Sequence, residues 1–117
     1  MSSTSERGLA AEERAAQFLR ARGYRIEERN YRCPAGELDI IAWDGDTLVF
    51  VEVRSRRDHR YGNAAHTVTE QKRRQLTRVA ASYLFDRAPT FSSSRFDVVG
   101  VTGDELLLFR DAFRMGI

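Results

Sequence analysis

Two acidic residues on neighbouring predicted strands are the first candidates for chemistry. Asp39 lies in the apolar segment 38–43 and Glu52 in the apolar segment 47–55. The Asp-Gly-Asp segment 44–46 between them is typical of a tight hairpin turn. If the last two residues of that segment form the tip, Asp39 falls directly opposite Glu52. A tip one residue earlier would shift the register by two positions.

Opposed carboxylates in an apolar hairpin repel each other, because directly facing side chains lie close together. A divalent cation would relieve the repulsion, and hard oxygen ligands are those that Mg²⁺ prefers. Strand alternation places Arg54 on the same face as Glu52. The spacing therefore favours a cation site at Asp39 and Glu52 with Arg54 beside it. The alternative is that both acids lie in water at the ends of their strands.

The basic residues are concentrated in one quarter of the chain. The net charge of all 117 residues is only +2, but residues 52–78 carry seven arginines and Lys72 against three acids, a net charge of +5. A concentrated basic segment is the feature expected for a polyanionic partner. A solvated loop and helix face explains the charge equally well.

These residues must be positioned by a small set of elements. The apolar periodicity predicts a first helix over 5–22, with a buried stripe at Leu9, Ala16 and Leu19, and a second helix that begins near Thr67, which has capping-box spacing to Glu70. The second helix buries a stripe of five residues: Leu76, Val79, Ala80, Tyr83 and Leu84. We expect strands over 24–30, 38–43, 47–55, 95–102 and 105–113, and loops over 31–36 and 56–66.

The run from Leu48 to Val53 is almost continuously apolar, so its strand should be covered on both faces, by one helix on each side. The sequence therefore predicts a single α/β domain over 1–117, a mixed β-sheet flanked by helices in the order α-β-β-β-α-β-β, with residues 1–5 disordered. No apolar run has the length of a membrane helix and no secretory signal is apparent. The single cysteine, Cys33, excludes an internal disulfide, and we expect a cytoplasmic protein.

The motifs around these acids resemble those of a known family. The segments Gly36-Glu37-Leu38-Asp39-Ile40-Ile41 and Leu48-Val49-Phe50-Val51-Glu52-Val53-Arg54 are similar to the signature of the UPF0102 family, small bacterial proteins related to the archaeal Holliday junction resolvases. The likeness extends from Gly8–Gly23, through Tyr61-Gly62 and Lys72, to Arg95-Phe96-Asp97-Val98-Val99. It implies the restriction-endonuclease-like fold and the PD-(D/E)xK nuclease pattern.

The resemblance implies a role for each matching position. Asp39 and Glu52 match the two metal-binding acids that would hold Mg²⁺ or Mn²⁺, with the Val53 carbonyl as a further ligand. Glu12 resembles a helix glutamate that assists the metal site. Glu37, two residues before Asp39, is either an outer ligand or a solvent-exposed strand start. Arg54 departs from the pattern because it stands where the lysine belongs, and a guanidinium cannot act as a general base near neutral pH.

The basic segment would then bind the nucleic acid. Arg56, Arg57 and Arg60 are expected to contact backbone phosphates, which position a duplex without reading its bases, and Tyr61 to stack or pack beside them. Arg73 and Arg74 on the second helix offer another place for the DNA. The alternative for the arginines at 56–60 is an ordinary surface loop.

Lys72 is the only lysine among nineteen basic residues. It begins the helical stripe that continues through Leu76, Val79 and Tyr83, so it should point toward the sheet. A partly buried lysine near a metal can have its pKa lowered enough to give up a proton, so Lys72 could replace the missing motif lysine. The alternative is that it lays its stem on Leu76 and extends its ammonium into water.

Two functional classes follow. The first is a metal-dependent, structure-selective DNA endonuclease in recombination or repair, acting on branched DNA as a homodimer, as the resolvase resemblance implies. The second is a nucleic-acid-binding module that keeps the nuclease fold without useful catalysis. A protein-interaction scaffold is a third interpretation, favoured only if no nucleic acid binds.

Overall fold

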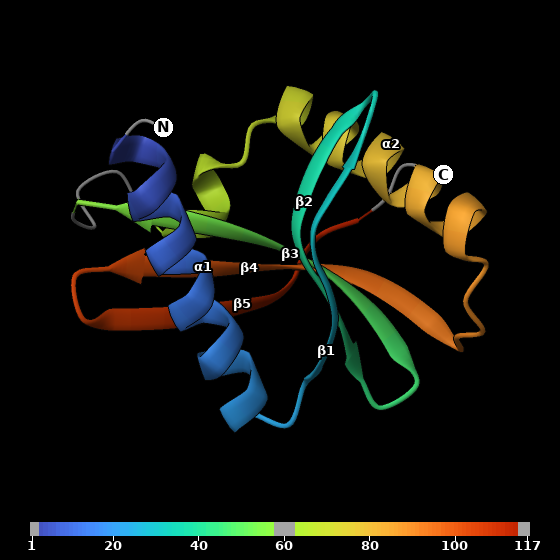
Figure 1. The fold of residues 1–117 in the computed structure, drawn as a ribbon, viewed down its shortest axis with the longest axis horizontal. Helices are drawn as coiled ribbons and strands as arrows, with labels where there is room; N and C mark the ends of the chain where they lie inside the picture. Colours follow the sequence, from blue (N-terminus) through green and yellow to red (C-terminus); the bar gives the residue numbers. More distant parts are fainter. Residues whose placement is uncertain (1–2, 58–62, 115–117) are drawn as a thin grey trace.

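The computed structural model describes residues 3–57 and 63–114 (Figure 1). Along the chain it contains two α-helices, five strands and one short 3-10 helix. These are α1 (Ser3–Ala21), β1 (Arg25–Cys33), β2 (Gly36–Asp44), β3 (Thr47–Arg56), η1 (Ala64–Thr67), α2 (Glu70–Arg87), β4 (Ser93–Thr102) and β5 (Glu105–Phe113). The predicted α-β-β-β-α-β-β order is confirmed.

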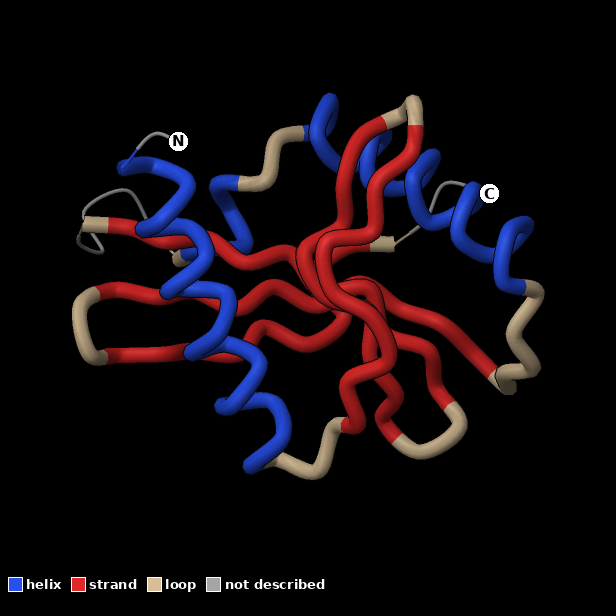
Figure 2. The backbone as a smooth tube through the Cα atoms, viewed as in Figure 1, coloured by secondary structure: helices blue, strands red, loops and turns tan. Residues whose placement is uncertain are grey.

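The five strands form one mixed sheet in the order β1-β2-β3-β4-β5. β3 and β4 are parallel and are joined through α2, whereas the other neighbouring pairs are antiparallel. The two helices cover different parts of the sheet, with α1 across β3 and β4 and α2 beside the β1–β2 hairpin (Figure 2).

Two apolar cores lie on the two faces of the sheet. Under α1, Ala15 and Leu19 pack on Val49 and Val51, whereas under α2, Leu76 and the rest of its stripe pack on Leu48 and Phe50. The predicted burial of the third strand on both faces is confirmed, because residues 48–51 are fully buried. On α1 the predicted stripe is wrong at Leu9, which is 48% exposed, because the buried face instead includes Ala11 and Glu12.

The β1–β2 hairpin rotates halfway along its length. Leu38 packs in the core under α2, although Ile40, two residues later, packs in the core under α1. Residues two apart in a regular strand share a face, so β2 must turn about its axis between them. The rotation carries the hairpin tip to the N-terminal half of α2 (Figure 1), where the Gln75 side-chain amide donates to the Ala35 carbonyl at 3.0 Å.

Element boundaries depart from the sequence prediction in three places. β1 continues to Cys33, so only Pro34 and Ala35 form the turn for which a loop over 31–36 was expected. The reason is Tyr31, whose ring is buried against Tyr83 at a centroid distance of 5.2 Å.

The start of α2 is the second difference. Thr69, not Thr67, is its N-cap, and the Thr69 hydroxyl accepts from the Lys72 N–H at 3.1 Å. Thr67 instead closes η1 by donating to the Ala64 carbonyl at 2.6 Å, and the first three residues of η1 lie within the segment predicted to be a loop.

The third difference is at the N-terminus. Here α1 includes Ser3–Ser5, although disorder was expected for residues 1–5. In the described part of the chain, neither α1 nor α2 is long and apolar enough to cross a membrane.

Candidate metal and nucleic-acid site

Asp39 lies where the backbone pairing of β2 is interrupted. The β2–β3 register runs from Asp44 opposite Thr47 to Ile40 opposite Val51, which confirms the predicted hairpin register, and it ends one position before Asp39 would face Glu52. At this point the Asp39 side chain, instead of its backbone, bonds to β3: Asp39 Oδ2 accepts a hydrogen bond from the Val53 N–H at 2.8 Å. Asp39 is thereby attached to β3 beside Glu52.

Glu52 is buried, with 5% of its surface exposed, and has cations on both sides. Its Oε2 lies 3.8 Å from an Arg54 guanidinium nitrogen and 4.0 Å from Lys72 Nζ. The predicted sharing of a face by Glu52 and Arg54 is therefore confirmed. Lys72 reaches the same carboxylate from the first turn of α2, so its side chain points toward the site as the helical stripe predicts.

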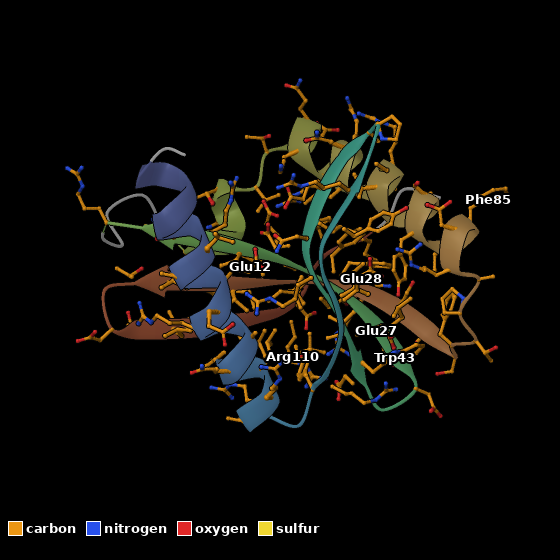
Figure 3. All side chains as sticks on the ribbon, viewed as in Figure 1. Glu12, Glu27, Glu28, Trp43, Phe85 and Arg110 are labelled. Carbon is orange, nitrogen blue, oxygen red and sulfur yellow. The ribbon has the colours of Figure 1, made fainter. Side chains whose placement is uncertain are left out.

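Glu12 approaches the acids from α1, where Figure 3 shows its side chain directed toward the sheet. It is also 5% exposed and accepts from Arg29 Nε at 3.1 Å, while a second Arg29 nitrogen donates to Glu13 at 2.6 Å. Glu12 and Asp39 are close enough for the charge of each to matter to the other. The helix and the hairpin thus bring a third carboxylate beside the pair.

The protonation of Asp39 shows how unfavourable this arrangement is for negative charge. Burial, with the charge of Glu52 as the next contribution, raises the pKa of Asp39 to about 8, although the Val53 N–H opposes the shift. Burial also raises the pKa of Glu12, against the opposing hydrogen bond from Arg29. A bound cation would remove the need for a proton at Asp39.

The donor set fits a hard divalent cation that keeps much of its water. Asp39 and Glu52 supply two carboxylates, which suffices for Mg²⁺ because this ion is usually held by one or two carboxylates and several waters. Within residues 3–57 and 63–114, no three His, Cys, Asp or Glu side chains are arranged to hold a metal ion. Glu12 lies close enough to Asp39 for their charges to interact, and this is its observed part in the site.

The other predicted residues are divided between the site and its surroundings. Glu37 pairs with Arg32 at 3.3 Å, although its charge adds to the raised pKa of Asp39. Arg56 is the last residue of β3 and is half-buried, and Arg57 follows the strand and is exposed. Arg60 and Tyr61 lie outside the described residues.

On α2, both predicted DNA contacts have partners inside the protein. Arg73 Nε donates to the Val68 carbonyl at 3.0 Å, and its guanidinium lies 5.2 Å from the centre of the Phe113 ring. Arg74 is exposed and pairs with Glu70 at 2.6 Å. Arg73 therefore supports the packing of α2. Of the two arginines, Arg74 is the one that presents its charge to solvent.

Arg54 is held in place by the short helix that precedes α2. Its guanidinium donates to the Thr67 carbonyl at 2.9 Å. η1 in turn lies against β4 at Gly100, where an added Cβ would come within 2.7 Å of the Ala64 side chain. Gly100 thus permits the close approach that brings η1, and with it the start of α2, to the acids.

Sequence reasoning missed a third buried carboxylate, Asp97. Its side chain is fully buried and accepts from Arg95 Nε at 2.9 Å, from the Tyr24 hydroxyl at 2.8 Å and from the Asp111 N–H at 2.9 Å. Arg95 also donates to Asp44 at 2.8 Å. The available signal was an acid inside the apolar run 96–101 with an arginine two residues before it.

Comparison with known proteins gives a consistent answer over most of the chain. The model of the Uncharacterised protein family UPF0102 matches residues 11–101. The chain is 44% identical over 112 residues to the UPF0102 protein of Syntrophus aciditrophicus (92% of this chain, 88% of the relative) and 50% identical over 95 residues to that of Moorella thermoacetica (81% and 79%). It is 43% identical over 117 residues to that of Nitrosomonas eutropha (99% and 100%). The chain therefore belongs to the UPF0102 family, as its acidic motifs indicated.

Proposed function

We propose that this protein is a metal-dependent endonuclease that hydrolyses phosphodiester bonds of branched or otherwise structured DNA in the cytoplasm, in recombination or repair. The observation that carries the proposal is the pair of half-buried Asp39 and buried Glu52, with Arg54 and Lys72 close to Glu52. Strongly perturbed carboxyl groups with nearby cations are typical of functional sites.

Each residue has a defined task in this proposal. Asp39 and Glu52, with the Val53 carbonyl, would hold Mg²⁺ or Mn²⁺, which would neutralise charge on the reacting phosphate and activate water. Arg54 contributes positive charge and hydrogen bonds but cannot accept a proton. Glu12 adds negative charge at the α1 side of the site, which strengthens cation binding.

Lys72 supplies what Arg54 lacks. Its ammonium is 4.0 Å from Glu52 Oε2 and about a third of its side chain is exposed, so it reaches both the acids and an incoming phosphate. An amine can orient and deprotonate water in its neutral form, whereas a guanidinium remains protonated. We expect Lys72→Arg to abolish cleavage and to leave DNA binding almost unchanged. Arg74→Lys is the control on the same helix, and retained cleavage in Lys72→Arg would remove Lys72 from the mechanism.

The direct test is incubation of the purified protein with branched, flapped, single-stranded and duplex DNA in the presence of Mg²⁺ or Mn²⁺. Cleavage of a branched substrate that is lost in Asp39→Ala and Glu52→Ala, and retained in the exposed control Asp104→Ala, would support the proposal. Calorimetric titration with Mn²⁺ should show binding that Asp39→Ala removes. An unchanged isotherm would make the site assignment wrong.

A DNA-binding module without useful catalysis is the second candidate. The observation that favours it is Arg54, which occupies the motif lysine position and is tied to the Thr67 carbonyl. Such a module would bind DNA equally well with and without Mg²⁺ and would cleave none of the four substrates. Sedimentation with and without branched DNA would test whether the protein acts as a homodimer.

The basic segment is the proposed binding surface for DNA phosphates. Replacing Arg56, Arg57 and Arg60 together with alanine should weaken binding and flatten its salt dependence, by about one unit of slope for each phosphate that is no longer neutralised. An unchanged slope would place the DNA elsewhere, with Arg74 as the next candidate.

A further inference from the structure

The pairing between β1 and β2 skips one position at the site. Arg29 faces Ile40 and Tyr31 faces Leu38, in the same register, but Asn30 and Asp39 between them are not paired. On its other side, Asp39 also lies beyond the last paired residue of the β2–β3 ladder. Asp39 is therefore absent from the backbone ladders on both sides of β2.

Both strands rotate at this unpaired position. The rotation of β2 between Leu38 and Ile40 has its counterpart in β1. Arg29 contacts Glu12 of α1, whereas Tyr31, two residues later, bonds to Ser82 and Asp86 of α2. The residue at the centre of the rotation in β1 is Asn30.

Asn30 has the backbone conformation that produces such a turn. Its φ angle is +57°, in the left-handed region that asparagine tolerates better than most residues and that β-branched residues strongly avoid. Its side chain also lies close enough to Glu12 to lower the pKa of that carboxyl. A left-handed residue within a strand redirects the chain, so the paired strand must follow.

We infer that Asn30 is a positioning residue whose left-handed backbone removes Asp39 from both ladders, so that the Asp39 carboxylate, rather than its peptide group, bonds to β3. The carboxylate is thereby directed to Val53 and Glu52. The same residue contacts Glu12, so one position in β1 organises two of the three acids. This inference deepens the proposed function and rests on it for the role of Asp39.

The test uses the Val53 amide as a reporter, because its N–H donates to Asp39. Amide hydrogen exchange is measured by NMR on the whole chain for the wild type, Asn30→Gly, Asn30→Ala and Asn30→Val. Glycine adopts the left-handed conformation freely, so Val53 protection should stay within about threefold of wild type. Valine opposes it, so exchange should accelerate about tenfold or more. Asp39→Ala, which removes the acceptor, gives the exchange rate of the unbonded amide.

Amides in the centre of β3 serve as internal controls for global stability. The result that supports the inference is loss of protection at Val53, with protection kept at Val49 and Val51, in Asn30→Val; Asn30→Ala gives the same reading if the valine variant does not fold. Wild-type protection of Val53 in both Asn30→Ala and Asn30→Val would overturn it.

Manganese affinity, measured calorimetrically on the same proteins, separates the two proposals. Weaker binding in Asn30→Val than in Asn30→Gly would connect the positioning to the metal site, and equal binding in the two would contradict that connection. If the wild type bound no Mn²⁺, the proposed function would fail, whereas the Val53 exchange rates would still decide the role of Asn30.

Discussion

Two regions of the sheet contain buried or half-buried carboxylates, and they differ in how far the protein compensates the negative charge. In the arginine-neutralised cluster, made of Tyr24, Asp44, Arg95 and Asp97, every carboxylate accepts from a guanidinium, and Asp97 also receives a hydroxyl and a backbone N–H. In the acidic pair, Asp39 and Glu52, Asp39 receives one backbone N–H, and the nearest cations stand 3.8 and 4.0 Å from Glu52.

Under the proposed function, this difference separates carboxylates that serve the fold from carboxylates that serve a ligand. Where only the fold must be stable, the chain supplies its own counter-charge, and Arg95 lowers the pKa of Asp44. Where the pKa of Asp39 rises to about 8, the chain leaves a requirement for positive charge that an exogenous cation can meet. The comparison predicts that mutations in the two regions change stability with opposite signs.

The largest effect is expected at Asp97. Asp97→Asn breaks a fully buried ion pair and leaves Arg95 with reduced compensation, so the free energy of unfolding should fall by about 3–5 kcal/mol. Urea unfolding followed by circular dichroism measures the loss. A change below about 1 kcal/mol, the level of a surface ion pair, would contradict the structural role assigned to Asp97.

The opposite sign is expected at Asp39. Asp39→Asn keeps an acceptor for the Val53 N–H but removes the charge, so the metal-free protein should gain about 1 kcal/mol or more at pH 8. The same substitution should eliminate Mn²⁺ binding. Parallel urea curves with and without Mn²⁺ check both statements, since the ion should stabilise the wild type and not the variant. Destabilisation in the absence of metal would show that the Asp39 charge supports the fold.

The two regions should also respond differently to pH. Folded Asp39 keeps its proton up to about pH 8, whereas in the unfolded chain Asp loses it near pH 4. Between these values the unfolded state binds fewer protons, so this group makes the protein less stable as pH rises from 4 to 8.

For Asp44, whose folded pKa is lowered, the stabilisation is present above the unfolded pKa and is lost as pH falls through the folded value. Urea unfolding between pH 3 and 9 should show both changes. Asp39→Asn should flatten only the decline between pH 4 and 8, and a decline that persisted in this range would assign it to another group.

The smallest effects separate a buried member of the arginine-neutralised cluster, Tyr24, from an exposed residue outside it, Arg110, that pairs with Asp44. Tyr24→Phe removes one hydrogen bond to Asp97 and should cost about 1 kcal/mol, because Tyr24 is buried. Arg110→Ala removes an exposed partner of Asp44 at 2.9 Å and should cost less than about 0.5 kcal/mol. Thermal unfolding of both variants would reveal any reversal of this order.

Sequence reasoning succeeded where a local signal determines the structure. The turn at Gly45-Asp46 and the alternation of the flanking strands were enough to predict the pairing as far as Ile40 opposite Val51, because hairpin register follows from the turn. The inward direction of Lys72 followed from helical periodicity.

Sequence reasoning failed where contacts between residues far apart in the chain determine the local structure. Burial of Tyr31 against α2 extends β1 through a segment that looks like a loop, and η1 uses Thr67, which leaves Thr69 to cap α2. The rotation at Asn30 has no periodic signature, because a single left-handed residue changes direction without changing composition. The groups around Asp97 and Arg95 come from the segment before β1, from β2 and from β5, so no local pattern predicts them.

The sheet's strand order has a consequence for folding. Strand order equals chain order, and three of the four neighbouring pairs are joined by two-residue turns, so only the β3–β4 pairing must close a long loop. The β2–β3 hairpin can therefore form early, while water still screens the repulsion between its two acids. We expect the repulsion to grow only when α1 and α2 exclude that water, after the hairpin contacts have formed. Removing it should slow unfolding and leave the folding rate almost unchanged.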